Sequence, residues 1–191
     1  MLNQVNDWLT SIIRDDNIEI FKFIFESYPS FFTENLPICK KNQSLLNCDQ
    51  SQSERMLIKS AEYGNEKILK FIIENKTDLL LLEGFDQHNI IITLIQNNHS
   101  ELVNKAIDHA PYYFKTLDSN GYLPIVELSR RGKLNEIVKL IKIIPNALLI
   151  RDGDGSNALS AAIRWNQQNE LIPYVDQFFP EYLTIENILP L

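Results

Sequence analysis

A step of 34 residues recurs through most of this chain. Residues suited to the end of a helix stand at this step four times, at Gly64, Asn98, Gly132 and Asn166. Glycine and asparagine both tolerate the left-handed backbone conformation in which many helices end. An Asp-x-x-Gly turn recurs at the same step, at 118–121 and at 152–155. A fixed period of this length is typical of arrays in which each unit packs against its neighbours, so the sequence predicts a repeat array.

Each unit contains two short segments whose apolar residues recur every three or four positions. This periodicity is typical of amphipathic helices and not of strands. In the fourth unit the segments are LPIVELSRR and LNEIVKLIKI, and in the fifth they are NALSAAIRW and NELIPYVDQFF. The middle three helix pairs are followed by partly apolar tails, TDLLLL, PYYFKTL and PNALLIRD. We expect these tails to be extended and to lead into a finger, with LLLLE at 79–83 buried in the core.

The unit resembles the ankyrin repeat, which has a turn and two helices in about 33 residues. The family motif is D-x-x-G-x-T-P-L-H-x-A-A-x-x-G-H. The fourth unit matches it at Asp118, Gly121, Pro124 and Gly132, and the fifth at Asp152, Gly155, Leu159 and Ala162. The segment EIVKLI at 136–141 matches the second-helix pattern E-h-V-K-L-L. The histidine of the motif is absent from the second to fifth units. The resemblance therefore implies an all-α, ankyrin-like solenoid of about five units, held more by Ile and Leu burial than by the family's polar network.

The repeat register divides the chain into segments. Residues 1–32 form a divergent N-terminal unit, and 33–50 form an insertion or a long finger. Four units then occupy 51–180, with boundaries at 51–83, 84–117, 118–151 and 152–180. A terminal repeat must cover an otherwise exposed core, so we expect residues 181–191 to act as a C-terminal cap.

Charge and composition narrow the partners and the compartment. The net charge of −7 argues against nucleic acid, which calls for a basic surface. No apolar run approaches the roughly 18 residues that span a bilayer, and the N-terminus lacks a signal-peptide layout. We expect a monomer without a membrane span, either cytoplasmic or secreted into a host cell without a classical signal peptide. Degenerate ankyrin units in an Ile-, Asn- and Lys-rich chain also resemble secreted effectors of intracellular bacteria, which act on host proteins.

Residues that could carry chemistry are few. His88, His99 and His109 have no paired metal-ligand spacing, and no glycine-rich phosphate loop occurs. Cys39 and Cys48 match no zinc knuckle or redox pair, and we interpret them as reduced thiols. A disulfide within one loop, or a nucleophile acting with a distant histidine, remain the alternatives. We expect no metal, no cofactor and no enzymatic activity.

The resemblance also implies where a partner would bind. Ankyrin proteins usually bind partners on a concave face built from finger tips and first helices. Aromatic and arginine side chains are enriched at interaction hot spots. The candidate partner-binding residues are Tyr63, Phe85, Tyr122, Arg130, Arg131, Arg164, Trp165, Glu62, Asn120 and Asp154. In an acidic protein the three arginines predict an acidic patch or a carboxylate on the partner. Alternatively, the arginines are solvated helix ends and the aromatics pack against neighbouring fingers.

These features predict a non-catalytic module that recognises a partner protein through its concave face. The first alternative is a dedicated inhibitor or regulator of one enzyme, in the manner of an antitoxin. The second is a cysteine-dependent enzyme that uses Cys39 or Cys48. Fold alone does not decide between these functions.

Overall fold

The structure is a computed structural model of the 191-residue chain. It describes residues 11–12, 14–27, 52–84 and 86–188. These residues are largely helical and include no strand, although Glu83 and Asn89 form an isolated antiparallel bridge. The all-α prediction is therefore confirmed. The predicted insertion at 33–50, with its two cysteines, lies outside the described residues.

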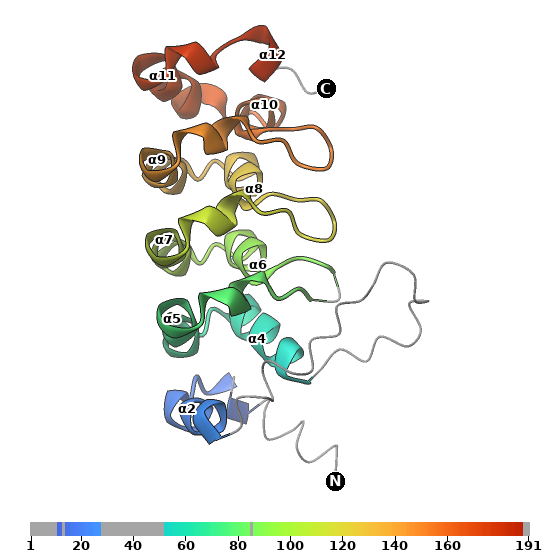
Figure 1. Cartoon of the computed structure of the whole chain (residues 1–191), viewed down its shortest axis with the longest axis vertical. Coiled ribbons are helices and arrows are strands. Elements are labelled where there is room, and N and C mark those ends of the chain that lie inside the picture. The colour runs from blue at the N-terminus through green and yellow to red at the C-terminus, as the bar shows by residue number, and fades with distance from the viewer. Residues whose placement is uncertain (1–10, 13, 28–51, 85, 189–191) are drawn as a thin grey trace, which may run out of the picture.

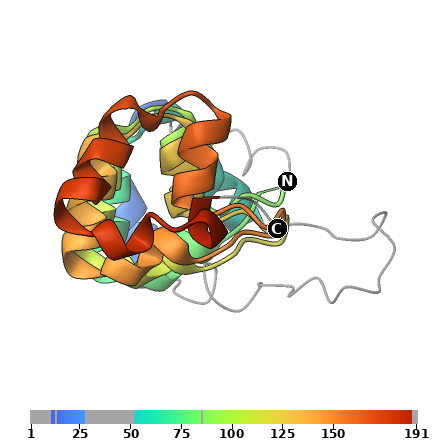
Figure 2. The same cartoon turned by 90° about the horizontal axis from the view of Figure 1, so that it is seen from above.

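Helix α2 (Ile18–Ser27) is followed by four helix pairs that stack in one column (Figure 1). The first helices of the pairs form an inner row: α4 (Gln52–Tyr63), α6 (Ile90–Gln96), α8 (Pro124–Arg130) and α10 (Ala158–Arg164). The second helices form an outer row: α5 (Glu66–Asn75), α7 (Ser100–His109), α9 (Leu134–Ile143) and α11 (Gln168–Phe178). Seen from above, the pairs superpose and the loops between them project from one side (Figure 2). We call these loops the fingers; they comprise residues 83–89 without 85, 117–123 and 151–157.

The 34-residue step is present in the backbone itself. Positive φ angles of 59–70° occur at the turn inside each pair, at Gly64, Asn98, Gly132 and Asn166. A second series of positive φ angles, of 60–81°, lies in the fingers at Gln87, Gly121 and Gly155. Each finger also closes on itself through a similar hydrogen bond, such as Asp118 N to Tyr122 O at 3.0 Å and Asp152 N to Ser156 O at 2.8 Å. The predicted repeat spacing is thus confirmed as a repeated conformation.

The inner helices begin where the sequence supplies a cap. The side chain of Asn89 accepts a hydrogen bond from Ile92 N at 2.9 Å and starts α6. Asn157 and Ser160 form a reciprocal capping box at the start of α10. Helix α8 begins instead at Pro124, whose fixed φ suits a first helical position and whose missing N–H would find no helical partner there.

The tails after the outer helices differ from the extended form that we predicted. Each forms a short 3-10 helix: η1 (Thr77–Leu81), η2 (Pro111–Lys115) and η3 (Pro145–Leu149). Proline at the first position of η2 and η3 sets a helical φ, and short 3-10 turns commonly follow α-helices. The burial predicted for 79–83 holds in part. Leu79 and Leu80 are buried, whereas the next three residues are only half-buried.

The core is a series of Ile- and Leu-rich layers between successive pairs. Every residue of α6 from Ile90 to Ile95 is buried, because this helix packs between α4 and α8 and against its own outer helix. At the C-terminal end, α12 (Ile185–Ile188) packs on α10, and Asn157 Nδ2 donates to Asn187 O at 2.7 Å. At the other end, Asp16 accepts hydrogen bonds from the backbone of Lys67 and Ile68 and so caps α5.

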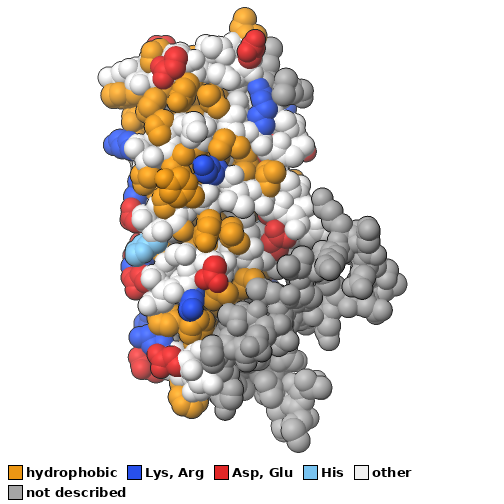
Figure 3. All heavy atoms as spheres, viewed as in Figure 1, with side chains coloured by type: hydrophobic (Ala, Val, Ile, Leu, Met, Phe, Trp, Pro, Cys, Tyr) orange, Lys and Arg blue, Asp and Glu red, His pale blue; other side chains and the backbone are white. Residues whose placement is uncertain are grey.

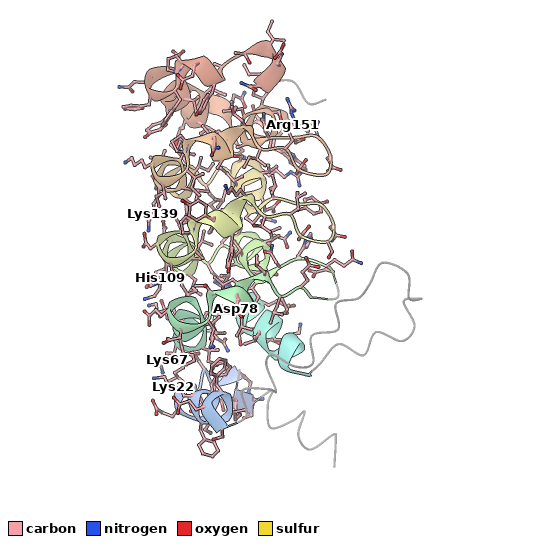
Figure 4. The ribbon with its side chains drawn as sticks, viewed as in Figure 1. Lys22, Lys67, Asp78, His109, Lys139 and Arg151 are labelled. Atoms are coloured by element: carbon pink, nitrogen blue, oxygen red, sulfur yellow. The ribbon has the colours of Figure 1, made fainter. Side chains whose placement is uncertain are left out.

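Ion pairs connect successive outer helices on the exposed side of the column. Lys70 Nζ lies 2.7 Å from Glu101 Oε1, Lys105 Nζ lies 2.5 Å from Glu74 Oε1, and Lys139 Nζ lies 2.7 Å from Asp108 Oδ2. Lys139 and His109 lie on this side of the column in Figure 4. The hydrogen bond from Lys105 lowers the pKa of Glu74, and that from Lys70 lowers the pKa of Glu101. Exposed pairs of this kind contribute little to stability.

Gly64 is expected to resist substitution. Its φ is +70°, and a Cβ there would collide with the imidazole ring of His99, whose Nε2–H donates to Glu62 O at 3.2 Å. We expect Gly64→Ala to lower the free energy of unfolding by about 1–3 kcal/mol, measured by urea denaturation. Removing the ring in Gly64→Ala/His99→Ala should recover the part of that loss caused by the collision. A stability of Gly64→Ala equal to wild type would contradict this prediction.

Candidate functional site

One position of the repeat stays at the surface in all four pairs. Directly before each turn stand Tyr63, Asn97, Arg131 and Trp165, which we call the inner-helix stripe. Tyr63 is 61% exposed and Trp165 is 55% exposed. The stripe lies at the C-terminal ends of the inner helices, each of which ends at or just before a stripe residue. Two large aromatic side chains are therefore held in solvent by the same backbone position, three units apart.

The other predicted site residues have more varied surroundings. Arg164 is exposed, and in the described part of the chain no carboxylate lies within ion-pair distance of it. Glu62 is half-buried and pairs with Lys59, and this hydrogen bond raises the pKa of Lys59. Asn120 is exposed at a finger tip, where its Nδ2 donates to Asp86 O. Phe85 lies outside the described residues.

Arg130 is the centre of a network between two fingers and an inner helix. Its Nη2 lies 2.9 Å from Asp152 Oδ2 and 3.7 Å from Asp154 Oδ2. Its guanidinium carbon lies 4.9 Å from the centre of the Tyr122 ring. The side chain of Arg130 is 13% exposed and that of Asp152 is 1% exposed, so this ion pair is shielded from water.

The network continues into the preceding finger and along α8. His88 Nδ1 lies 2.9 Å from Asp118 Oδ2, and the rings of His88 and Tyr122 meet edge to face with centroids 5.1 Å apart. On α8, the buried Glu127 accepts from Arg131 Nε at 2.6 Å. Arg131 Nη1 also donates to the carbonyl of Gln96 in the preceding unit at 3.1 Å. We call the whole set the finger network; its members are His88, Asp118, Tyr122, Glu127, Arg130, Arg131 and Asp152.

The finger network bears on the predicted acidic partner. Two of the three arginines that suggested such a partner are already paired with carboxylates of this chain, Arg130 with Asp152 and Arg131 with Glu127. Among the three, Arg164 is the one that offers an unmatched charge. The prediction of an acidic or carboxylate-bearing partner therefore rests on Arg164 alone.

Direct hydrogen bonds also join the fingers to one another. Gly153 N donates to Gly121 O at 2.7 Å, and Ser119 N donates to Glu83 Oε1 at 2.8 Å. Within the last finger, Asp152 Oδ1 accepts from the backbone N–H groups of Asp154 and Ser156. These hydrogen bonds fix the finger tips relative to each other. A surface that is already ordered loses little conformational entropy when a partner binds to it.

Sequence reasoning did not find the acidic half of the finger network. We assigned Asp118 and Asp152 to turns, which is correct but leaves out the side chains that they contact, His88 and Arg130. The available signal was Glu127, a single charged residue within the apolar helix segment LPIVELS. A charge on a buried helical position needs a partner, and the two arginines that follow it supply one.

Three further observations concern metal ligands, membrane-spanning helices and similarity to known proteins. Among these residues, no three His, Cys, Asp or Glu side chains come together as metal ligands would. None of the described helices is long and apolar enough to cross a bilayer. No protein-family model matches the sequence, and no curated protein shows detectable similarity to it.

Proposed function

We propose that this chain is an ankyrin-like solenoid that acts as a non-catalytic protein-binding module. Recognition takes place on the inner-helix stripe and the adjacent finger tips. The observation that carries the proposal is the exposure of Tyr63 and Trp165 at one repeated position. Large aromatics on a surface are typical of interaction hot spots, where a partner desolvates them.

The helix pairs, the 34-residue step and the hydrogen-bonded fingers support the ankyrin-like assignment. Packed helices lie about 8–10 Å apart, so the ends of the stripe are separated by about 25–30 Å. An extended peptide covers that distance with about eight or nine residues. The stripe therefore suits an extended segment or a helix edge of a partner protein, with Tyr63 and Trp165 as apolar anchors at its two ends.

Two tyrosines with the same exposure give a matched test. Tyr63 and Tyr112 are each 61% exposed, but Tyr112 belongs to η2, on a different element of the unit. The 3-10 turns lie on the face seen in Figure 3, where hydrophobic side chains also reach the surface. We expect Tyr63→Ala and Trp165→Ala each to weaken capture of a partner by about tenfold or more, because losing a hot-spot aromatic costs about 2 kcal/mol or more. Tyr112→Ala should retain wild-type capture.

The measurement is affinity capture with immobilised protein, quantified by mass spectrometry, followed by titration of the captured partner with each variant. Circular dichroism checks that all variants are folded. A partner that is lost with Tyr112→Ala and kept with Tyr63→Ala would place recognition on the 3-10 face and overturn the proposal.

A further inference from the structure

A small cavity opens between the fourth and fifth units. Its volume is about 220 Å³, and we call it the turn pocket. The lining includes Ser129, Gly132, Ile137, Gln167, Glu170 and Leu171. Gly132 and Asn166, which also lines the cavity, directly follow Arg131 and Trp165, so the turn pocket adjoins the inner-helix stripe.

The repeat register explains why the space exists here. The position of Ser129 corresponds to Ala61 and Ile95 in earlier units and to Ile163 in the last unit. At the junction between the third and fourth units, a counterpart of the turn pocket is lined by Ile95, Lys133 and Glu136, and it has no room for a water molecule. Serine lacks the carbon atoms with which isoleucine fills this space. The spacing of the outer helices also leaves room for the cavity, because α9 packs closely on α7 but meets α11 over few residues.

Several polar groups at and beside this junction can accept hydrogen bonds. Ser129 is 1% exposed, and its Oγ has no hydrogen-bond partner within the described chain. Next to the lining residues, the buried Oε1 of Gln168 in the first turn of α11 also has no partner within the described chain. Pro173 has no N–H to donate to the carbonyl of Asn169, which lines the cavity. Among the described lining residues, Glu170 is the charged one.

These features define the chemistry of an occupant. A volume of about 220 Å³ is below the range of roughly 300–1,000 Å³ that is usual for small-molecule and cofactor sites, and it suits one side chain. Ile137 and Leu171 provide apolar contact for an aliphatic stem, while the acceptors and the carboxylate favour a head group that is positive and rich in donors. Lysine and arginine combine these properties. The net charge of −7 also attracts basic segments.

We propose that the turn pocket binds a lysine or arginine side chain presented by a protein partner. This inference rests on the proposed function, because the partner would lie on the adjacent stripe. The side chain lays its methylene groups on Ile137 and Leu171 and directs its cation toward Glu170 and Ser129 Oγ.

The pocket can be tested without knowing the partner. Full-length ¹⁵N-labelled protein is titrated with n-butylamine, n-butylguanidine, butyrate and n-butanol at constant ionic strength, and amide shifts are followed by NMR. The two cations should give saturable shifts at the amides of Gly132, Gln167 and Glu170. Butyrate and butanol should give none. Equal shifts with butyrate, or no saturable shift with either cation, would overturn the proposal.

Two variants locate the binding. Ser129→Ile copies the residue of the preceding unit and fills the space, so it should abolish the shifts while the thermal midpoint stays equal or rises. Glu170→Gln keeps the shape and removes the charge, and it should weaken cation binding by roughly two- to fivefold. Unchanged cation affinity in Ser129→Ile would place binding elsewhere and overturn the proposal. A failure here, with capture still lost in Tyr63→Ala, would reject the turn pocket and leave the proposed function intact.

Discussion

Replacing Arg130 with methionine is expected to lower the free energy of unfolding by about 3–5 kcal/mol. The side chain of Asp152 is 1% exposed and that of Glu127 is 8% exposed, and both lie within ion-pair distance of Arg130. Methionine keeps much of the aliphatic stem but removes the charge. Asp152 would then remain buried without its cation, and such a charge costs far more than an exposed ion pair contributes. Urea denaturation followed by circular dichroism measures the loss.

Arg164→Met provides the matched control for this experiment. Arg164 occupies the same repeat position one unit later, 34 residues on, but it is exposed. Its replacement should change stability by no more than about 0.5 kcal/mol. In Arg130→Met/Asp152→Asn, the amide removes the unpaired charge and keeps an oxygen for the Asp154 and Ser156 N–H groups, so part of the stability should return. If Arg130→Met lowered the free energy of unfolding by less than about 1 kcal/mol, the buried carboxylates of Asp152 and Glu127 would not depend on Arg130 for stability.

The sequence predicted the repeat and its helices well because both depend on local rules. Positive φ at Gly64, Asn98, Gly132 and Asn166 follows from the residue types that tolerate it. Helical periodicity is likewise a property of ten or twelve neighbouring residues. The tails were predicted less well. An apolar run such as LLLL is compatible with a strand or with a short 3-10 turn, and the prolines that begin η2 and η3 favoured the turn.

The candidate site was harder to predict, because it depends on contacts between distant residues. Arg130 and Asp152 are 22 positions apart, and His88 and Asp118 are 30 apart. No short motif encodes either contact, so Arg130 and Arg131 looked like free charges. Once the units are aligned, however, the sequence does show a serine at 129 where another unit has isoleucine. The alignment of the units therefore indicates a space at position 129, but it does not predict the volume of the turn pocket.

Replacing Phe114 with alanine is expected to lower the free energy of unfolding by about 3–5 kcal/mol. Phe114 is fully buried in η2, which packs against both α7 and α8. The equivalent residues Leu80 and Leu148 are also fully buried, so this position fills the layer between successive units. Truncation there removes apolar contact and leaves a cavity that the neighbouring helices can close only in part.

Because Phe114 lies at a junction in the middle of the column, its loss should also weaken the coupling between the two halves. In repeat arrays stability is close to a sum of unit terms and nearest-neighbour terms, so a weak junction allows the halves to unfold separately. Trp165 fluorescence, in a Trp8→Phe background, reports on the fifth unit, while far-ultraviolet circular dichroism reports on all helices. We expect the two urea transitions to coincide in wild type and to separate in Phe114→Ala. Phe178, 53% exposed on α11, supplies the control: Phe178→Ala should lose less than about 1 kcal/mol with coincident transitions. Coincident transitions in Phe114→Ala, with a similarly small loss, would mean that this layer does not couple the units.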